Sequence, residues 1–271
     1  MTQQPTLQGR TALVTGSLQG IGLAIAERLA RDGVAVVLHG LADADQTATA
    51  EAAVRAAGAA DVMSTHHDLS DVAAIDALMG AANGWRGGLD ILVNNAGIQF
   101  TASIIDMPPQ RWESILAVNL SAAFHTMRRA LPGMLERGYG RVVNIASVHG
   151  MVASVNKAPY VAAKFGLVGL TRVAALECAA AGSRDSGGVT ANCIAPGWTE
   201  TAIIEPQIMA RTENVGGDRA LAISELLAEK QPSRRMSKPS EIAEVAGMLC
   251  QHWAHNITGT TVPVDGGWTA Q

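Results

Sequence analysis

Short apolar runs alternate with longer amphipathic or Ala-rich stretches along nearly the whole chain. Short apolar runs bounded by turn residues favour buried strands, and the longer stretches favour helices. The alternation predicts an α/β fold: a single Rossmann-type, doubly wound parallel sheet of about seven strands with helices on both faces. Strands are expected at Thr11–Thr15, Ala35–Leu38, Val62–His66, Ile91–Asn94, Arg141–Ile145, Thr190–Ile194 and Thr261–Val264. Helices are expected at about Gly20–Arg31, Ala44–Ala57, Val72–Ala82, Pro109–Arg137, Pro159–Ala181 and Pro239–Gln251.

The length of 271 residues favours one domain spanning 1–271, because doubly wound sheets commonly reach this size as single units. Two segments interrupt the rhythm. Gly182–Gly188 is polar and rich in Gly and Ser, which predicts a surface loop. After Pro196 the chain leaves the pattern, and Ile203–Ile208 with Leu221–Leu227 could form small helices. We expect a substrate lid at about 197–238.

Composition limits the classes of partner. Apolar residues make up 48% of the chain and the net charge is −4, so no basic face is indicated and nucleic acid is not expected to bind. Cys178, Cys193 and Cys250 are odd in number and far apart, which favours buried reduced thiols over disulfides. Met1–Arg10 lacks an apolar stretch of signal-peptide length, and no later run reaches the ~18 residues of a membrane span. We therefore expect a cytoplasmic protein without a membrane partner.

A glycine-rich turn follows the first expected strand. Gly16, Gly20 and Gly22 open a helical stretch, where glycine lets the backbone approach a pyrophosphate at a helix N-terminus. Such a pattern alone could be a structural turn, but the strand before it and the helix after it favour a dinucleotide site. His66 and His67 could suggest a metal, yet adjacent residues in a strand point to opposite faces, so no metal is expected.

Tyr160 and Lys164 stand four residues apart in a helical stretch, thirteen residues after Ser147. This spacing places a phenol and an ammonium on one helix face. A nearby cation can lower the pKa of a phenol from about 10 toward a useful acid/base range. Hydride transfer to a ketone creates an alkoxide that needs a proton and hydrogen bonds, which Tyr and Ser can supply. The spacing alone is weak evidence, since Ser147 could simply end a strand.

Together, Thr15–Gly22 (TGSLQGIG), Asn94–Gly97 (NNAG) and the Ser147, Tyr160 and Lys164 set resemble the short-chain dehydrogenase/reductase family over nearly the whole chain. The resemblance implies that Tyr160 is the general acid/base and that Ser147 anchors the substrate carbonyl. Lys164 would be the electrostatic partner of Tyr160 and would bind the nicotinamide ribose.

The resemblance also assigns residues around that core. Asn119 would hold a water-linked proton relay, although it could equally be a buried polar residue within a helix. A homotetramer built through the helix of Tyr160 and the C-terminal strand is implied as well. The implied cofactor-binding residues are Gly16, Ser17, Gln19, Gly20, Ile21, Gly22, Asp68, Leu69, Asn95, Ala96, Gly97, Tyr160, Lys164, Pro196 and Gly197.

The end of the second strand bears on the choice between NAD and NADP. An acid there usually bonds the ribose hydroxyls, whereas an arginine accepts the 2′-phosphate. This chain departs from the usual acid by placing His39–Leu41 (HGL) there. No Lys or Arg occurs between Arg31 and Arg55, and Asp43 and Asp45 add negative charge, so a phosphate would lack a strong partner. The sequence therefore favours NAD.

Less common residues around the core indicate the substrate. An ammonium, an imidazole and two amides could form a carboxylate clamp, and two indoles could form apolar walls around a short carbon chain. Pro159 is suited to begin the catalytic helix, which would leave the clamp lysine just outside it. The blander alternatives are a solvated lysine, a loop-packing histidine and core tryptophans. The clamp residues are Gln99, His149, Lys157 and Gln207, and the wall residues are Trp198 and Trp268.

The sequence thus predicts an NAD-dependent dehydrogenase whose partner is a small carboxylate, a short 3-hydroxy acid and its keto form. One alternative is a family reductase for another keto substrate, such as a 3-oxoacyl thioester, on which a carboxylate clamp would be wasted. Another is a non-catalytic dinucleotide-sensing protein, which has no need of an intact Ser147, Tyr160 and Lys164 set.

Overall fold

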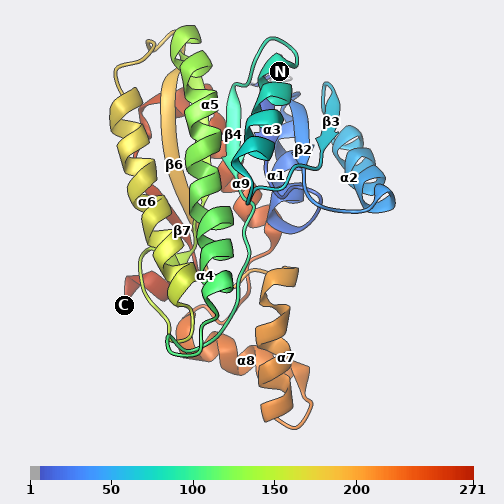
Figure 1. Ribbon diagram of the computed structural model, residues 1–271, viewed down its shortest axis with the longest axis vertical. Helices are drawn as coiled ribbons and strands as arrows, with labels where there is room; N and C mark the ends of the chain where they lie inside the picture. The colour runs from blue at the N-terminus through green and yellow to red at the C-terminus, as the bar shows by residue number, and fades with distance from the viewer. Residues whose placement is uncertain (1–6) are drawn as a thin grey trace.

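The computed structural model describes residues 7–271, so most of the Met1–Arg10 stretch considered above lies outside the described residues. Seven strands form one sheet in the order β3-β2-β1-β4-β5-β6-β7, and every neighbouring pair is parallel (Figure 1). The predicted doubly wound sheet is confirmed. The strands are β1 Thr11–Val14, β2 Ala35–His39, β3 Val62–Thr65, β4 Ile91–Asn94, β5 Tyr139–Ile145, β6 Gly188–Pro196 and β7 Thr261–Val264.

Helices cover both faces of this sheet, as the alternation predicts (Figure 1). Side chains alternate across β1, where Ala12 and Val14 join the core formed with α1, α2 and α9. Leu13 between them points into the opposite core, formed with α3, α5 and α6. The helices are α1 Gly20–Arg31, α2 Ala44–Ala56, α3 Val72–Gly84, α4 Pro109–Leu116, α5 Ala122–Arg137, α6 Ala158–Cys178, α7 Glu205–Asn214, α8 Arg219–Lys230 and α9 Pro239–Cys250.

Two element boundaries differ from the prediction for physical reasons. The long helix expected at Pro109–Arg137 is interrupted by a π-helical turn at Ala117–Ser121 between α4 and α5. Strand β5 begins at Tyr139 rather than Arg141, because Tyr139 and Gly140 find backbone partners in the equally early start of β6. Sequence patterns missed this extension, since glycine is a poor strand former.

Residues 197–238 form a separate helical excursion, called here the α7–α8 segment. Its two helices pack on each other and project from the lower end of the molecule in Figure 1. A single parallel bridge between Thr199 and Ser237 closes the segment at its base. The Ser237 amide donates to the Trp198 carbonyl at 2.9 Å, and the Glu200 amide donates to the Ser237 carbonyl at 3.0 Å. The expected small helices are therefore present, and both are longer than predicted.

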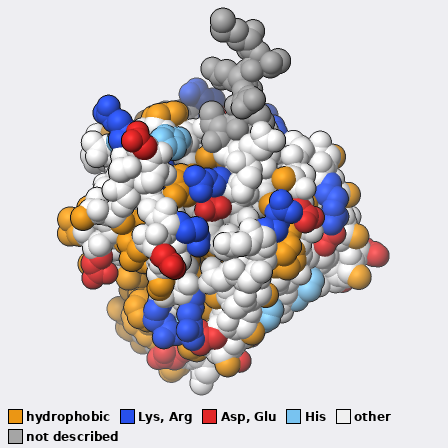
Figure 2. All heavy atoms as spheres, turned by 90° about the horizontal axis from the view of Figure 1, so that it is seen from above, with side chains coloured by type: hydrophobic (Ala, Val, Ile, Leu, Met, Phe, Trp, Pro, Cys, Tyr) orange, Lys and Arg blue, Asp and Glu red, His pale blue; other side chains and the backbone are white. Residues whose placement is uncertain are grey.

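The loop before β6 lies at the surface, and the three cysteines lie in the interior. Gly182–Gly188 leads into β6, and residues 182–185 are exposed. The three cysteines are buried free thiols, as expected. On the face drawn in Figure 2, Lys and Arg side chains are interspersed with Asp and Glu rather than gathered into one basic surface. Within residues 7–271, no helix is both long and apolar enough to cross a membrane.

Candidate active site

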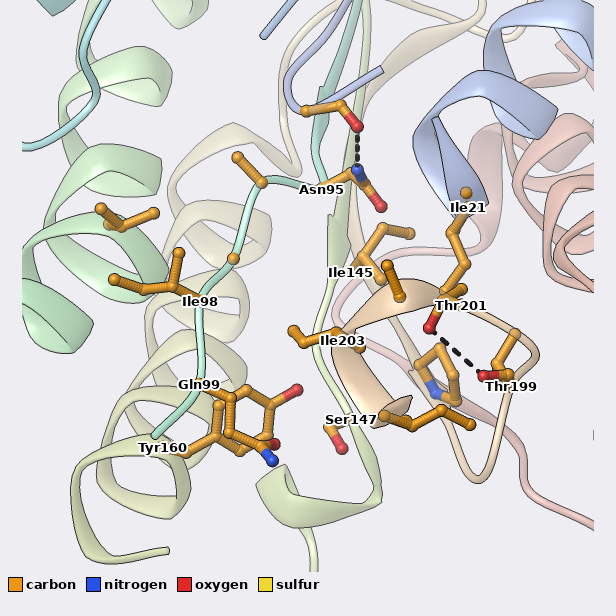
Figure 3. A pocket seen from close by; sticks show the side chains of 18 of the residues that line it. Ile21, Asn95, Ile98, Gln99, Ile145, Ser147, Tyr160, Thr199, Thr201 and Ile203 are labelled. Atoms are coloured by element: carbon orange, nitrogen blue, oxygen red, sulfur yellow. Dashed lines mark hydrogen bonds between the residues drawn. The ribbon is translucent and has the colours of Figure 1, made fainter. Parts of the chain in front are cut away.

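A cavity of about 390 Å³ opens at the carboxyl ends of the strands and runs from the glycine-rich turn to α7 (Figure 3). Most of the predicted site residues meet there, although they come from segments spread over the whole chain. Three predicted residues, Ser17, Gly22 and Asn119, are not part of its lining. Those that line it are Gly16, Gln19, Gly20, Ile21, Asp68, Leu69, Asn95, Ala96, Gly97, Gln99, Ser147, His149, Lys157, Tyr160, Lys164, Pro196, Gly197, Trp198, Gln207 and Trp268.

The glycine-rich turn forms one end of the cavity. Gly16 has φ +62°, a left-handed conformation that favours glycine. A Cβ on Gly22 would lie 2.3 Å from the Gly16 carbonyl oxygen, so no side chain fits there. The Asn95 side-chain amide donates to the carbonyls of Thr15 at 2.9 Å and Gly16 at 3.0 Å, which fixes the turn; Figure 3 shows one of these bonds. This cradle at the N-terminus of α1 fits the pyrophosphate of a dinucleotide.

The end of β2 closes the same part of the cavity. His39 is buried, its Nδ1 accepts from the Gly16 amide at 3.3 Å, and its Nε2 bonds the His67 carbonyl at 2.8 Å. Burial lowers the pKa of His39, so the imidazole is neutral. Leu41 is exposed. No Lys or Arg is among the described residues that line this end of the cavity.

Metal-ligating side chains do not gather anywhere in the described part of the chain: residues 7–271 contain no group of three or more His, Cys, Asp or Glu arranged for an ion. His66 instead bonds the Gly40 carbonyl through Nδ1 at 2.8 Å. The His66 ring therefore bonds a backbone group of the loop after β2.

The reacting end combines β5 and α6. Ser147 follows β5 and caps the short turn Val148–Gly150, accepting from the His149 amide at 3.2 Å. Tyr160 and Lys164 lie on α6 and both are buried. Lys164 Nζ donates to the Ile145 carbonyl at 2.7 Å, which ties the catalytic helix to the end of β5.

The expectation that Lys164 lowers the pKa of Tyr160 is wrong for this structure. Burial raises the pKa of Tyr160 to about 12, and only the nearby Ser147 hydroxyl acts in the other direction. The Lys164 ammonium is held by a backbone carbonyl and lies 5.6 Å from the centre of the phenol ring. Burial also lowers the pKa of Lys164 to about 8. Burial of Tyr160 therefore changes the pKa of its phenol more than the Lys164 ammonium on the same helix face does.

Asn119 lies in the π-helical turn and contacts the loop after β4. Its Oδ1 accepts from the Ile98 amide at 2.8 Å, and its Nδ2 donates to the Ile98 carbonyl at 2.9 Å. The amide thus fixes the backbone next to Gln99. A small cavity of about 10 Å³, near the smallest space that can hold one water, borders Asn119 and Thr15. The proton relay itself stays a prediction.

The four residues of the carboxylate clamp line the opposite end of the cavity. Lys157 Nζ donates to Gln207 Oε1 at 2.7 Å, which joins the N-cap of α6 to α7. His149 Nδ1 lies 3.3 Å from Ser147 Oγ, and its Nε2 lies 3.0 Å from Ser154 Oγ. Pro206 occupies the first turn of α7 and leaves Gln207 directed at the lysine.

Burial changes the protonation of two clamp residues. It lowers the pKa of Lys157 to about 8, so the side chain is still mostly an ammonium at neutral pH. It lowers the pKa of His149 to about 3, with a further contribution from the Lys157 charge, so the imidazole is neutral. The clamp therefore offers one positive charge together with neutral hydrogen-bonding groups.

The two wall tryptophans complete this end. The rings of Trp198 and Trp268 lie 6.0 Å apart, and Trp268 meets His149 edge to face at 5.6 Å. Lys157 Nζ lies 5.6 Å from the Trp198 ring centre, a cation–π distance. The tryptophans are thus both core and wall, since they also pack on Ile204 and Leu226 of the α7–α8 segment.

Sequence reasoning missed part of the lining. Thr199, Thr201 and Ile203 also face the cavity from the start of the α7–α8 segment (Figure 3). Their side chains carry no distinctive chemistry, so the only available signal was their position directly after β6. His39 was noted only for the acid it replaces, although its hydrogen bonds organise the turn.

Comparison with known proteins agrees with this geometry. A family model described as enoyl-(acyl carrier protein) reductase matches residues 16–269. The chain is 47% identical over 266 residues to the D-beta-hydroxybutyrate dehydrogenase of Cupriavidus necator, covering 98% of this chain and 100% of that protein. The chain belongs to the short-chain dehydrogenase/reductase family. The predicted family and oxidoreductase class are thereby confirmed.

Other members of the family are also similar over their whole length. The D-beta-hydroxybutyrate dehydrogenase of Rhizobium meliloti is 43% identical over 262 residues, covering 97% of this chain and 99% of that protein. The crystal structure of an actinorhodin polyketide ketoreductase with NADPH superposes with a TM-score of 0.88 at 33% identity, covering 100% of both chains. The fold of the chain is therefore one that binds a dinucleotide.

Proposed function

We propose that the chain is an NAD-dependent dehydrogenase that interconverts (R)-3-hydroxybutyrate and acetoacetate. The observation that carries this proposal is the buried Lys157 ammonium, which makes no ion pair within residues 7–271 and lines the same cavity as Tyr160. A buried charge is costly unless it is paired, so an anion bound beside this lysine would be favoured. The names of the two dehydrogenases described above support a short hydroxy acid as its source.

The clamp suits a free carboxylate better than an ester. A carboxylate has two acceptor oxygens and bonds strongly to an ammonium and amide N–H groups. Lys157 already bonds Gln207 on α7, so an anion bound there would contact both the fixed wall and the α7–α8 segment. The indoles of Trp198 and Trp268 leave an apolar surface for a short carbon chain.

Tyr160 and Ser147 would act on the oxygen at carbon 3. The glycine-rich turn, Asn95 and Lys164 would hold the dinucleotide, which would accept or supply the hydride. In the reduction direction, the protonated phenol donates its proton to the carbonyl oxygen, and the raised pKa of Tyr160 keeps that proton available at neutral pH. Ser147 Oγ hydrogen-bonds the same oxygen and stabilises its developing negative charge. In oxidation, the deprotonated phenolate of Tyr160 takes the proton from the hydroxyl group, so the raised pKa favours the reduction direction at neutral pH.

NAD is proposed over NADP because a 2′-phosphate would find no cation at the end of β2. Both ring nitrogens of His39 are engaged, Nδ1 by the Gly16 amide and Nε2 by the His67 carbonyl. Its pKa is lowered, so it offers no positive charge. The exposed Leu41 and the acidic Asp43, the N-cap of α2, offer no positive charge that could pair with a 2′-phosphate.

Two alternatives are disfavoured by particular observations. A reductase for a 3-oxoacyl thioester would leave the Lys157 ammonium buried opposite a neutral group. A non-catalytic dinucleotide sensor would not require Ser147 and Tyr160 to line one substrate-sized cavity.

Turnover measured with NAD on a panel of hydroxy acids, their methyl esters and 3-hydroxyacyl thioesters separates these readings. We expect the highest kcat/KM for (R)-3-hydroxybutyrate. A higher value for the thioester would replace the proposal with the reductase, and no turnover of any compound together with tight NAD binding would indicate a sensor.

We also propose that the α7–α8 segment closes over bound substrate. Gln207, Trp198 and Ile204 of this segment line the cavity, and the bridge between Thr199 and Ser237 pairs the two ends of the segment where it leaves the body. Closure would hold the hydrogen-bonded pair of Gln207 and Lys157 against the carboxylate and exclude water.

A homotetramer is proposed from two separate faces. Helices α5 and α6 expose Phe124, Phe165, Val173 and Leu176, and β7 is an edge strand of the sheet. Two independent self-complementary interfaces generate a tetramer with dihedral symmetry. Light scattering should then give the mass of four 28.1 kDa chains, and a monomeric mass would overturn this assembly.

A further inference from the structure

We propose that His39 is a positioning residue for the dinucleotide: its neutral, Nε2-protonated imidazole holds the glycine-rich turn in the shape that binds the pyrophosphate. This role goes beyond the proposed function and holds for NAD and NADP alike. It concerns the cofactor site alone, so a failure of the substrate assignment would not affect it.

Both the backbone and the side chain of His39 form hydrogen bonds with the glycine-rich turn. Its backbone amide donates to Ser17 Oγ at 3.0 Å, and its carbonyl accepts from the Ser17 amide at 2.8 Å. Its ring Nδ1 accepts from the Gly16 amide at 3.3 Å. Main chain and side chain of one residue therefore hold two successive residues of the turn.

These contacts matter because the peptide between Thr15 and Gly16 lies after β1 and before α1, so no helix or strand holds it. Gly16 lies in the left-handed region, outside both β1 and α1. The Thr15–Gly16 peptide is held on both sides, because the Thr15 carbonyl accepts from the Asn95 side-chain amide at 2.9 Å and the Gly16 N–H donates to His39 Nδ1 at 3.3 Å. The orientation of this peptide is therefore set by two side chains, one from β2 and one from the loop after β4.

The third segment tied by His39 is the loop after β3. Nε2 lies 2.8 Å from the His67 carbonyl, directly before Asp68 and Leu69, which line the cavity. A carbonyl can only accept, so Nε2 must carry the proton, and the Gly16 N–H requires Nδ1 to be free of one. One tautomer alone satisfies both contacts. Burial of the ring lowers its pKa and keeps it in this neutral state.

The test compares three variants by titration of NAD and NADH and by steady-state kinetics. His39→Leu removes both ring contacts, and we expect the dissociation constant and the KM for the dinucleotide to rise roughly tenfold, as for loss of a net hydrogen bond, with kcat little changed. His39→Asn keeps an acceptor near the Nδ1 position, so it should restore most of the affinity. His66→Leu is the matched control, because His66 is exposed and bonds Gly40 instead of the turn.

Three results would overturn the proposal. The first is an unchanged dissociation constant in His39→Leu. The second is an equal loss in His39→Leu and His39→Asn, which would make the ring a mere space-filler. The third needs no variant: the ¹⁵N spectrum of the wild-type protein should show His39 protonated at Nε2, and protonation at Nδ1 would exclude the Gly16 contact even if the variants failed to fold.

Discussion

The two ends of the cavity are built by different means. At the cofactor end, the surface is formed by backbone groups and by glycines, which have no side chain, as at Gly16 and Gly22. At the substrate end, side chains from separate segments meet, as in the bond between Lys157 and Gln207, fifty residues apart. The first end belongs to the sheet and its loops, and the second spans the sheet and the α7–α8 segment. Changes at the first end should therefore alter dinucleotide affinity, whereas changes at the second should alter the choice of substrate.

The largest expected effect lies where the two ends meet. Tyr160→Phe removes the proton donor and keeps the ring, so kcat should fall about a thousandfold, within the range of general acid–base catalysis. The dissociation constant for NAD, measured by fluorescence titration, should stay unchanged. Comparable turnover in the variant would exclude Tyr160 as the acid/base, and a parallel loss of NAD affinity would show that the two ends are not separable here.

The next effect is confined to the substrate end. Lys157→Met removes the ammonium and keeps an apolar stem beside Trp198, which should cost roughly 2–4 kcal/mol, or about 30-fold to 900-fold in kcat/KM for acetoacetate. A neutral methyl ester never uses the charge, so the ratio of kcat/KM for acetoacetate to that for its methyl ester should fall.

The matched control for this change is Lys230→Met. Lys230 is an exposed residue at the end of α8, and its charge acts on His149 from a distance. The Lys230→Met variant loses one positive charge but keeps all four clamp residues. Its ratio of kcat/KM for acetoacetate to that for the methyl ester should therefore match that of the wild type. An unchanged ratio in Lys157→Met would remove the main support for a carboxylate substrate.

The substrate end should also make stability depend on pH. The pKa of His149 is about 3 in the folded protein, against about 6.5 when the chain is unfolded. The unfolded chain therefore binds the proton first, and stability is full above pH ~6.5 and falls as the pH drops from there toward 3. Between pH 6.5 and pH 5 this loss is about 2 kcal/mol.

Urea unfolding at these two pH values measures the loss. His149→Gln should remove most of this difference, whereas His66→Gln, a change of an exposed histidine, should leave it in place. The same pH dependence in His149→Gln and in the wild type would assign the acid sensitivity to other groups.

The smallest effect belongs to the cofactor end. NAD should be preferred to NADP at least tenfold in kcat/KM, an energy of about 1.4 kcal/mol. Leu41→Arg places a cation at the end of β2 and should narrow the gap, while Leu41→Gln, of similar length without the charge, should not. Equal use of both dinucleotides by the wild type would mean that another cation reaches the 2′-phosphate.

The same difference between the two ends explains what the sequence could predict. Local sequence patterns predicted the strands, the glycine-rich turn and the set of Ser147, Tyr160 and Lys164. In the structure, Gly16 of that turn and the three residues of the set line one cavity. The π-helical turn at Ala117–Ser121 has no local sequence signature. The direction of the pKa of Tyr160 was predicted wrongly because burial depends on tertiary packing, which outweighed a pairing at helix spacing.

The clamp was predictable in its members but not in its contacts. The residue types of Lys157 and Gln207 indicated an anion site, yet their direct bond depends on the way α7 folds back toward α6. Likewise, His39 was noted as a missing acid, and only the structure reveals that both of its ring nitrogens are used.

The bridge between Thr199 and Ser237 has an evolutionary consequence. It fixes the points where the chain departs from the body and returns at about one strand spacing, ~5 Å. The stretch between them can then be lengthened, shortened or exchanged at little cost, because doubling a loop adds only about 0.6 kcal/mol of closure entropy. Grafting the corresponding stretch of another family member at Thr199 and Ser237 should therefore yield a chimera that retains dinucleotide affinity and acquires the donor's acyl-chain preference.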